Sequence, residues 1–201
     1  MGKTIRVEET VIVPEGVTIT ISKGFINVKG KRGSLRKKLP RAPVLYRNVD
    51  VAGKKKADKA KKGIKISMFL ANRKRQSCVI SLSKYINNLI KGVTVGYEYK
   101  LRFGYNILPQ RPQAIQGGKA FEISNYMGQK DTHVMKCPEG VIVKNHEDPK
   151  VKEIYVSGID VQHVGQMASV MSQKCLPRKL DRRVFMDGIY IDVRSTIEKA
   201  D

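Results

Sequence analysis

The stretch NRKRQSCVISLSKYINNLIKGVTVGYEYKLR, residues 72–102, joins a predicted amphipathic helix to a predicted strand. Apolar residues recur at helical spacing from Val79 to Ile90, so one side of the helix can pack while the other can meet an anion. Asn72 is the predicted N-cap and Gly92 the predicted stop. From Tyr97 to Tyr105, aromatic and apolar residues then alternate with polar ones, which is typical of a half-buried strand. The stretch therefore predicts a helix that completes one unit and a strand that begins the next.

Two features of this stretch allow two interpretations each. The aromatic residues from Tyr97 to Tyr105 fit either a buried core, which we favour, or a surface on which single-stranded bases stack. The polar side of the helix could contact an anionic partner or simply face solvent, and it is a secondary candidate interface. That side consists of Lys84, Asn87, Asn88 and Lys91.

The charge of the chain favours a polyanionic partner, with nucleic acid as the first candidate. The sequence has 39 Lys and Arg residues against 18 Asp and Glu residues, a formal net charge of +21. Such a charge repels itself in a free compact protein. It is also unevenly placed, because residues 1–95 carry +18 and residues 96–201 carry +3.

Length and an internal repeat predict an α+β fold with two tandem, duplicated small domains. A chain of 201 residues exceeds the usual size of one domain. A predicted hairpin, residues 16–30, resembles a second one, residues 140–158, and each is followed by one amphipathic helix. We therefore expect domains at 1–95 and 96–201, each a mostly antiparallel sheet with one helix packed on it. A chance similarity between two hairpins remains the alternative.

The basic residues of the first half lie in glycine-rich or lysine-rich loops and at the helix start. Glycine lets a backbone approach a phosphate closely, and clustered lysines order most readily around phosphates. Cations at a helix N-terminus oppose the helix dipole, which favours a role toward a partner. The alternative for these groups is a solvated surface. The predicted RNA contacts of the first domain are Lys31, Arg32, Arg36, Lys54, Lys55, Lys56, Lys61, Lys62, Arg73, Lys74 and Arg75.

A second basic cluster lies between Pro177 and the last predicted strand, and it is either a phosphate-binding patch or a solvated tail. It contains Arg178, Lys179, Arg182 and Arg183. The helix before it is expected to begin at an N-cap, Asp160, and to stop at Pro177.

The residues give no support for catalysis, a metal or a cofactor. His133 and Cys137 form one loose pair where a zinc site needs two close pairs. Gly117-Gly118-Lys119 resembles the end of a phosphate loop, but Pro112 and Ala120 stand where a glycine and a Ser or Thr are needed. No spacing places a nucleophile beside a base. We expect a non-enzyme with no bound cofactor or metal.

The cellular compartment is inferred from the absence of membrane-spanning and secretion signals. No apolar run approaches the length of a membrane span, and the first residues lack the pattern of a signal peptide. Cys78, Cys137 and Cys175 are isolated and odd in number, which predicts reduced thiols packed as small apolar groups. We therefore expect an intracellular protein with no membrane partner.

Several stretches closely resemble one family of the large ribosomal subunit. They are Asn72–Lys74, Asn88–Arg102, Asn125–Lys130 and Phe185–Tyr190, together with Pro14–Val17 and Val28–Gly30 with Gly33 in the first hairpin. In these residues the chain is similar to the universal large-subunit ribosomal protein six family, called large-subunit ribosomal protein nine in eukaryotes. A departure is Phe69-Leu70-Ala71, which replaces the family's aromatic–glycine approach to the helix.

The resemblance implies a structural constituent of the large subunit that binds rRNA without catalysis. It implies a place near the sarcin–ricin region and the stalk base, with neighbouring ribosomal proteins as partners and translation factors docking nearby. It adds Lys130 and supports Arg178 to Arg183 as RNA contacts. The implied location is the cytoplasmic ribosome, with nucleolar passage if the source is eukaryotic. The alternative is a non-ribosomal RNA-binding or RNA-chaperone protein on the same scaffold.

Overall fold

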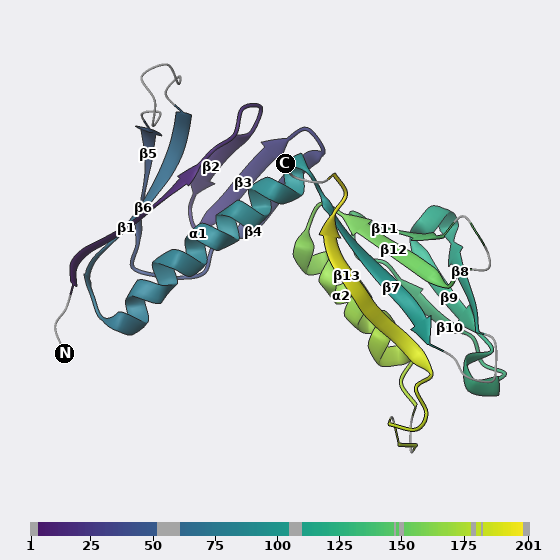
Figure 1. Cartoon of the computed structure of the whole chain (residues 1–201). Coiled ribbons are helices and arrows are strands. Elements are labelled where there is room, and N and C mark those ends of the chain that lie inside the picture. Colours follow the sequence, from purple (N-terminus) through teal and green to yellow (C-terminus); the bar gives the residue numbers. More distant parts are fainter. Residues whose placement is uncertain are drawn as a thin grey trace. The chain divides into compact units, whose positions relative to one another are not determined.

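The computed structural model describes residues 4–51, 61–104, 110–146, 148, 151–177, 180–181 and 183–198. The chain divides into two compact units, Met1–Thr94 and Val95–Asp201. Each contains one α-helix and two small sheets (Figure 1), and every strand pairing in these described ranges is antiparallel. The predicted class, tandem α+β units with antiparallel sheets and one helix each, is confirmed.

In its described residues, the first unit contains six strands followed by a helix. One sheet has the order β1-β6-β5 and the other the order β2-β3-β4. The predicted hairpin is present, because Lys23 (φ 49°) and Gly24 (φ 77°) form a tight two-residue turn between β2 and β3. The elements are β1 (Thr4–Ile12), β2 (Thr18–Ser22), β3 (Phe25–Gly30), β4 (Gly33–Lys38), β5 (Leu45–Val51), β6 (Lys61–Ala71) and α1 (Arg73–Thr94).

The apolar side of α1 forms the core of the first unit with both of its sheets. The buried side chains of the helix include Val79, Leu82, Ile86 and Val93, and those of β6 include Ile66. The predicted stop at Gly92 is wrong, since α1 continues to Thr94. A mid-helix glycine costs about 1 kcal/mol, less than is gained by burying Val93 completely. The left-handed glycine that follows the helix is Gly96, at φ 78°.

The second unit has a four-stranded sheet, β11-β12-β7-β13, and a three-stranded sheet, β10-β9-β8. Three predicted elements are present: the hairpin of β11 and β12, the last strand, β13, and helix α2. The sequence did not predict β8, β9 and β10 of this unit, or β4 of the first unit. The elements are β7 (Tyr97–Gly104), β8 (Arg111–Ile115), β9 (Ala120–Ser124), β10 (His133–Lys136), β11 (Val141–Asn145), β12 (Glu153–Gly158), α2 (Val161–Lys174) and β13 (Gly188–Thr196), with 3-10 turns at Gln116–Gly118 and Tyr126–Gly128.

The aromatic residues of β7 belong to the core, as favoured from the sequence. Tyr97 and Phe103 are buried in one cluster with the apolar side of α2, so they are not a stacking surface. Helix α2 begins as predicted, because the carboxylate of Asp160 accepts a hydrogen bond of 3.0 Å from the backbone N–H of Gln162. Tyr105 lies outside the described residues.

A glycine at the end of a strand lets the helix approach closely in both units. A Cβ added to Gly30 would lie 2.7 Å from Val93 Cγ2 of α1, and one added to Gly158 would lie 2.8 Å from Val164 Cγ2 of α2. Gly30 ends β3 and Gly158 ends β12, the equivalent strands of the two predicted hairpins. Any side chain at either position would push the helix away from its sheet.

We expect Gly158→Ala to lower the free energy of unfolding by roughly 1–3 kcal/mol, because the added methyl overpacks this contact. The matched control is Gly165→Ala within α2, whose Cβ would meet only Tyr99 Cε2 at 3.9 Å. That variant should gain about 0.5–1 kcal/mol from helix propensity. Urea denaturation of both variants checks the expectation, and equal midpoints would contradict it.

Candidate nucleic-acid interface

The turn between β3 and β4, together with β4 itself, presents cations of two kinds. Lys31 is exposed, and Arg36 is exposed with its guanidinium carbon 4.9 Å above the ring of Phe25. Arg32 is half-buried at the end of α1, where its backbone N–H donates to Val93 O at 3.0 Å and its Nε to Thr94 O at 3.3 Å. A cation there satisfies carbonyls at the negative end of the helix dipole. Arg32 thus stabilises the helix end, a role that the sequence did not reveal.

The first turn of α1 carries three exposed cations, Arg73, Lys74 and Arg75, and no acidic residue. The carbonyl of Asn72 accepts from the N–H of Arg75 at 2.8 Å and of Gln76 at 3.0 Å, so the helix begins where the sequence predicted. Three positive charges here oppose the helix dipole. The placement is electrostatically unfavourable for the helix, and a bound phosphate would offset it.

The remaining predicted contacts are spread over both units. Lys62 of β6 and Lys130 are exposed. Arg183 is exposed but paired, since its Nη2 lies 3.0 Å from Asp181 Oδ2. This pairing holds the pKa of Asp181 below its usual value. Outside the described residues lie Lys54, Lys55, Lys56, Arg178, Lys179, Arg182 and the side chain of Lys61.

The secondary candidates on α1 lie on its outward side. Lys84, Asn88 and Lys91 are exposed, and Asn87 is half-buried.

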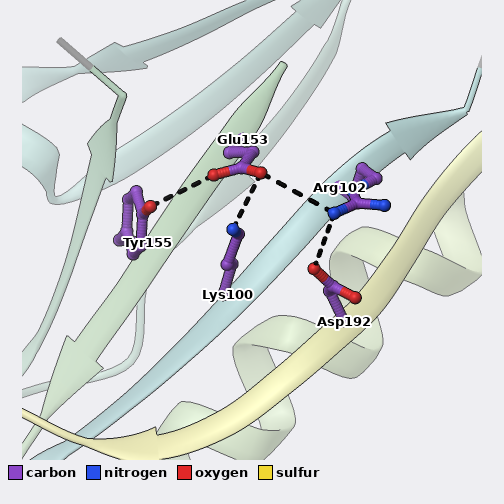
Figure 2. Close-up of polar contacts among 5 residues, drawn as sticks. All are labelled: Lys100, Arg102, Glu153, Tyr155 and Asp192. Atoms are coloured by element: carbon purple, nitrogen blue, oxygen red, sulfur yellow. Dashed lines mark hydrogen bonds and ion pairs between the residues drawn. The ribbon is translucent and has the colours of Figure 1, made fainter. Parts of the chain in front are cut away.

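The sheet face of the second unit that points away from the buried core carries a balanced ion cluster (Figure 2). Glu153 Oε1 lies 2.8 Å from Lys100 Nζ and 3.9 Å from Arg102 Nη2, which in turn lies 3.2 Å from Asp192 Oδ2. The hydroxyl of Tyr155 donates to Glu153 Oε2 at 3.1 Å. The residues come from β12, β7 and β13, so the cluster ties three neighbouring strands together.

The charges of this cluster stabilise one another. The hydrogen bond from Lys100 holds the pKa of Glu153 below its usual value and raises the pKa of Lys100. Burial raises the pKa of Tyr155. Two cations face two carboxylates, so this face presents little unbalanced charge to a polyanion.

One surface of the first unit is formed by residues that are distant in the sequence. On the sheet β1-β6-β5, the guanidinium carbon of Arg6 lies 5.6 Å from the centre of the Phe69 ring. On the same face, Lys65 Nζ lies 2.6 Å from Glu8 Oε2, and Arg6 pairs with the same carboxylate. Arg6 and Phe69 are far apart in sequence, and only the strand register brings them together.

The structure offers no arrangement suited to a metal among the residues it describes. No group of three or more His, Cys, Asp or Glu side chains lies close enough to hold an ion there. His133 Nε2 instead lies 3.1 Å from Gln129 Oε1, and His163 Nδ1 lies 3.1 Å from Glu139 O.

The three cysteines are free but occupy different environments. Cys175 is buried and Cys137 half-buried, and burial raises the pKa of both thiols, to about 11 for Cys175. Cys78 is exposed on the outward side of α1, so its predicted packing as a small apolar group is wrong. In the described part of the chain, neither helix has the length and apolar character required to cross a membrane.

Comparison with known proteins gives consistent similarities along the chain. The family model of ribosomal protein L6 matches residues 115–188. The chain is 36% identical over 199 residues to large ribosomal subunit protein uL6A of Schizosaccharomyces pombe, covering 99% of this chain and 98% of the relative. It is 33% identical over 198 residues to uL6 of Ignicoccus hospitalis, covering 98% and 100%, and 36% identical over 197 residues to uL6 of Candida albicans, covering 97% of each.

We expect Glu153→Gln to lower the melting temperature at neutral pH, because the ion pairs with Lys100 and Arg102 are lost. The folded-state pKa of Glu153 is depressed, so its charge stabilises the fold above its unfolded pKa of about 4.3. That stability disappears as the pH falls through the folded pKa. Melting curves should therefore differ at pH 7, draw together as the pH falls below the unfolded pKa, and coincide only below the depressed folded pKa. A constant difference across this range would contradict the assignment.

Proposed function

The chain belongs to the ribosomal protein L6 family, and we propose that it binds large-subunit rRNA near the sarcin–ricin region and the stalk base. It is a structural constituent of the large ribosomal subunit, and its family is not enzymatic. In the proposed position it supports the site where translation factors dock. Neighbouring ribosomal proteins are its other partners.

The first turn of α1 is the observation that carries RNA binding. Arg73, Lys74 and Arg75 are exposed together at the end of a helix whose own dipole disfavours them. Lys31, Arg36 and Lys62 add exposed cations on other elements of the same unit. A phosphate backbone provides anions at the spacing needed to neutralise such groups.

We assign different contributions to the two halves of the chain. Residues 1–95 act as a domain whose basic residues, including Lys54 to Lys56, neutralise rRNA phosphates. Residues 96–201 act as a second domain that contacts rRNA through Lys130 and the segment from Arg178 to Arg183. The protein works in the cytoplasmic ribosome, after nucleolar passage if the cell is eukaryotic.

Replacing Arg73, Lys74 and Arg75 together with Gln tests the role of the helix start. If all three neutralise phosphates, the slope of log affinity against log salt for an rRNA fragment should fall by roughly 2–3, with weaker binding at all salt concentrations. Fluorescence anisotropy over about 50–200 mM salt measures both quantities.

The matched control replaces three exposed cations of the second unit, Lys136, Lys144 and Lys174, with Gln. It makes the same change in net charge at positions with no proposed contact, so its slope should change by much less. Equal slopes for the two triple variants would show that only overall charge matters and would refute the assignment to α1.

Stable association with the large subunit tests the ribosomal function itself. We expect the full chain to sediment with isolated large subunits after a high-salt wash, because a structural constituent is held by many simultaneous contacts. Exclusive recovery in free fractions would instead indicate a non-ribosomal RNA-binding or RNA-chaperone protein.

A further inference from the structure

Strand register defines one open face on the three-stranded sheet of the first unit. Phe69 of β6 lies opposite Arg6 of β1, and Lys65 of β6 lies opposite Arg47 of β5. Directly opposed residues point to the same side of a sheet, and so do residues two apart on a strand. All four side chains therefore share one face, which we call the outer sheet face and which also includes Glu8 and Leu45.

The opposite face of this sheet is already occupied by the core. Ile64, Ile66 and Met68 of β6 alternate with the residues of the outer sheet face and are at most 3% exposed. Helix α1 covers this inner side. The outer sheet face differs, because Phe69 is 51% exposed and Leu45 is 48% exposed. A half-exposed aromatic ring thus lies on the central strand of the sheet.

The charges around this ring are mainly positive. Arg6, Arg47 and Lys65 share the outer sheet face with a single described carboxylate, Glu8. Hydrogen bonding from Lys65 lowers the pKa of Glu8, so this carboxylate stays ionised at neutral pH and orients two of the cations. The remaining charge on the face is positive, with Arg6 beside the apolar ring and Lys65 and Arg47 further along the sheet.

We propose that the outer sheet face binds an unpaired nucleotide of RNA, whose base stacks on Phe69 while Arg6, Arg47 and Lys65 contact the adjoining phosphates. The inference rests on the proposed function, since it takes RNA as the partner and specifies how this unit recognises it. An aromatic ring on a sheet is a general platform for an unstacked base. A base within a duplex keeps its faces covered by its neighbours, so the site selects bulges, loops or single strands.

The chemistry of the face favours RNA over an apolar protein segment. Apart from Phe69, the exposed apolar side chains of this face are Leu45 and, at the far end of β1, Ile12. Three cations share the face, and Arg6 lies against the ring. The guanidinium of Arg6 already lies near the ring face, and this arrangement can extend to a stacked base. Stacking on aromatic rings tolerates any base, so weak sequence preference is expected.

Binding of a single-stranded oligoadenylate of roughly eight nucleotides to the full chain tests the proposal. Phe69→Leu keeps an apolar side chain but removes the ring, and it should weaken this binding about tenfold. Phe69→Trp should retain or strengthen it. The salt slope of Phe69→Leu should equal that of the original protein, because lost stacking releases no counterions.

The matched control is Phe185→Leu, which removes a 39% exposed ring from the second unit. It should leave oligoadenylate affinity unchanged. Equal affinities of Phe69→Leu and the original protein, with both folded by their melting curves, would overturn the proposal. A chain that binds folded rRNA fragments but no oligoadenylate would also overturn it, while leaving the proposed function standing.

Photo-cross-linking gives a readout that does not depend on variant folding. A single-stranded RNA containing 5-bromouridine should form its adduct on the peptide that carries Phe69. An adduct found only on other segments would refute the assigned site. Failure to bind any RNA, including rRNA fragments, would instead refute the proposed function, and this inference with it.

Discussion

Electrostatic repulsion among 39 basic side chains is the constraint that the rest of this structure must satisfy. The second unit satisfies it internally, by pairing Lys100 and Arg102 with Glu153 and Asp192. The first half has few carboxylates for this purpose, and its cations lie instead on a turn, a helix start and an open sheet face, away from its apolar core. The fold thus neutralises much of its charge internally in one half and leaves it exposed at the surface in the other.

The core beneath these cations depends on close contact between each helix and its sheet. Gly30 and Gly158 occupy equivalent positions in the two hairpins, and each leaves room for one valine of the following helix. In the first unit, the same contact brings Arg32 to the last carbonyls of α1. The absence of a Cβ at Gly30 therefore sets how closely α1 packs on its sheet. This close packing lets Arg32 of the β3–β4 turn hydrogen-bond to the end of α1.

The sequence predicted the elements whose signals are local. The β2–β3 turn and the Asp160 cap act within a few residues, and both were found where expected. Strand β4 was missed because Leu35 is the one apolar side chain among its small and basic residues, and β8 because it is short and contains Pro112. The helix end predicted at Gly92 was wrong because the burial of Val93 outweighs the tendency of glycine to end a helix. The outer sheet face was invisible because register between distant segments, not spacing, brings Arg6 and Arg47 to opposite sides of the strand that carries Phe69.

The unequal exposure of the three thiols gives the protein a built-in chemical reporter. Cys137 and Cys175 are shielded and reluctant to ionise, whereas Cys78 faces solvent one turn after the basic start of α1. Thiol alkylation proceeds through the thiolate, so a maleimide applied to the folded chain will modify Cys78 first. A fluorophore attached there would sense the environment of the helix start during assembly, without any engineered cysteine.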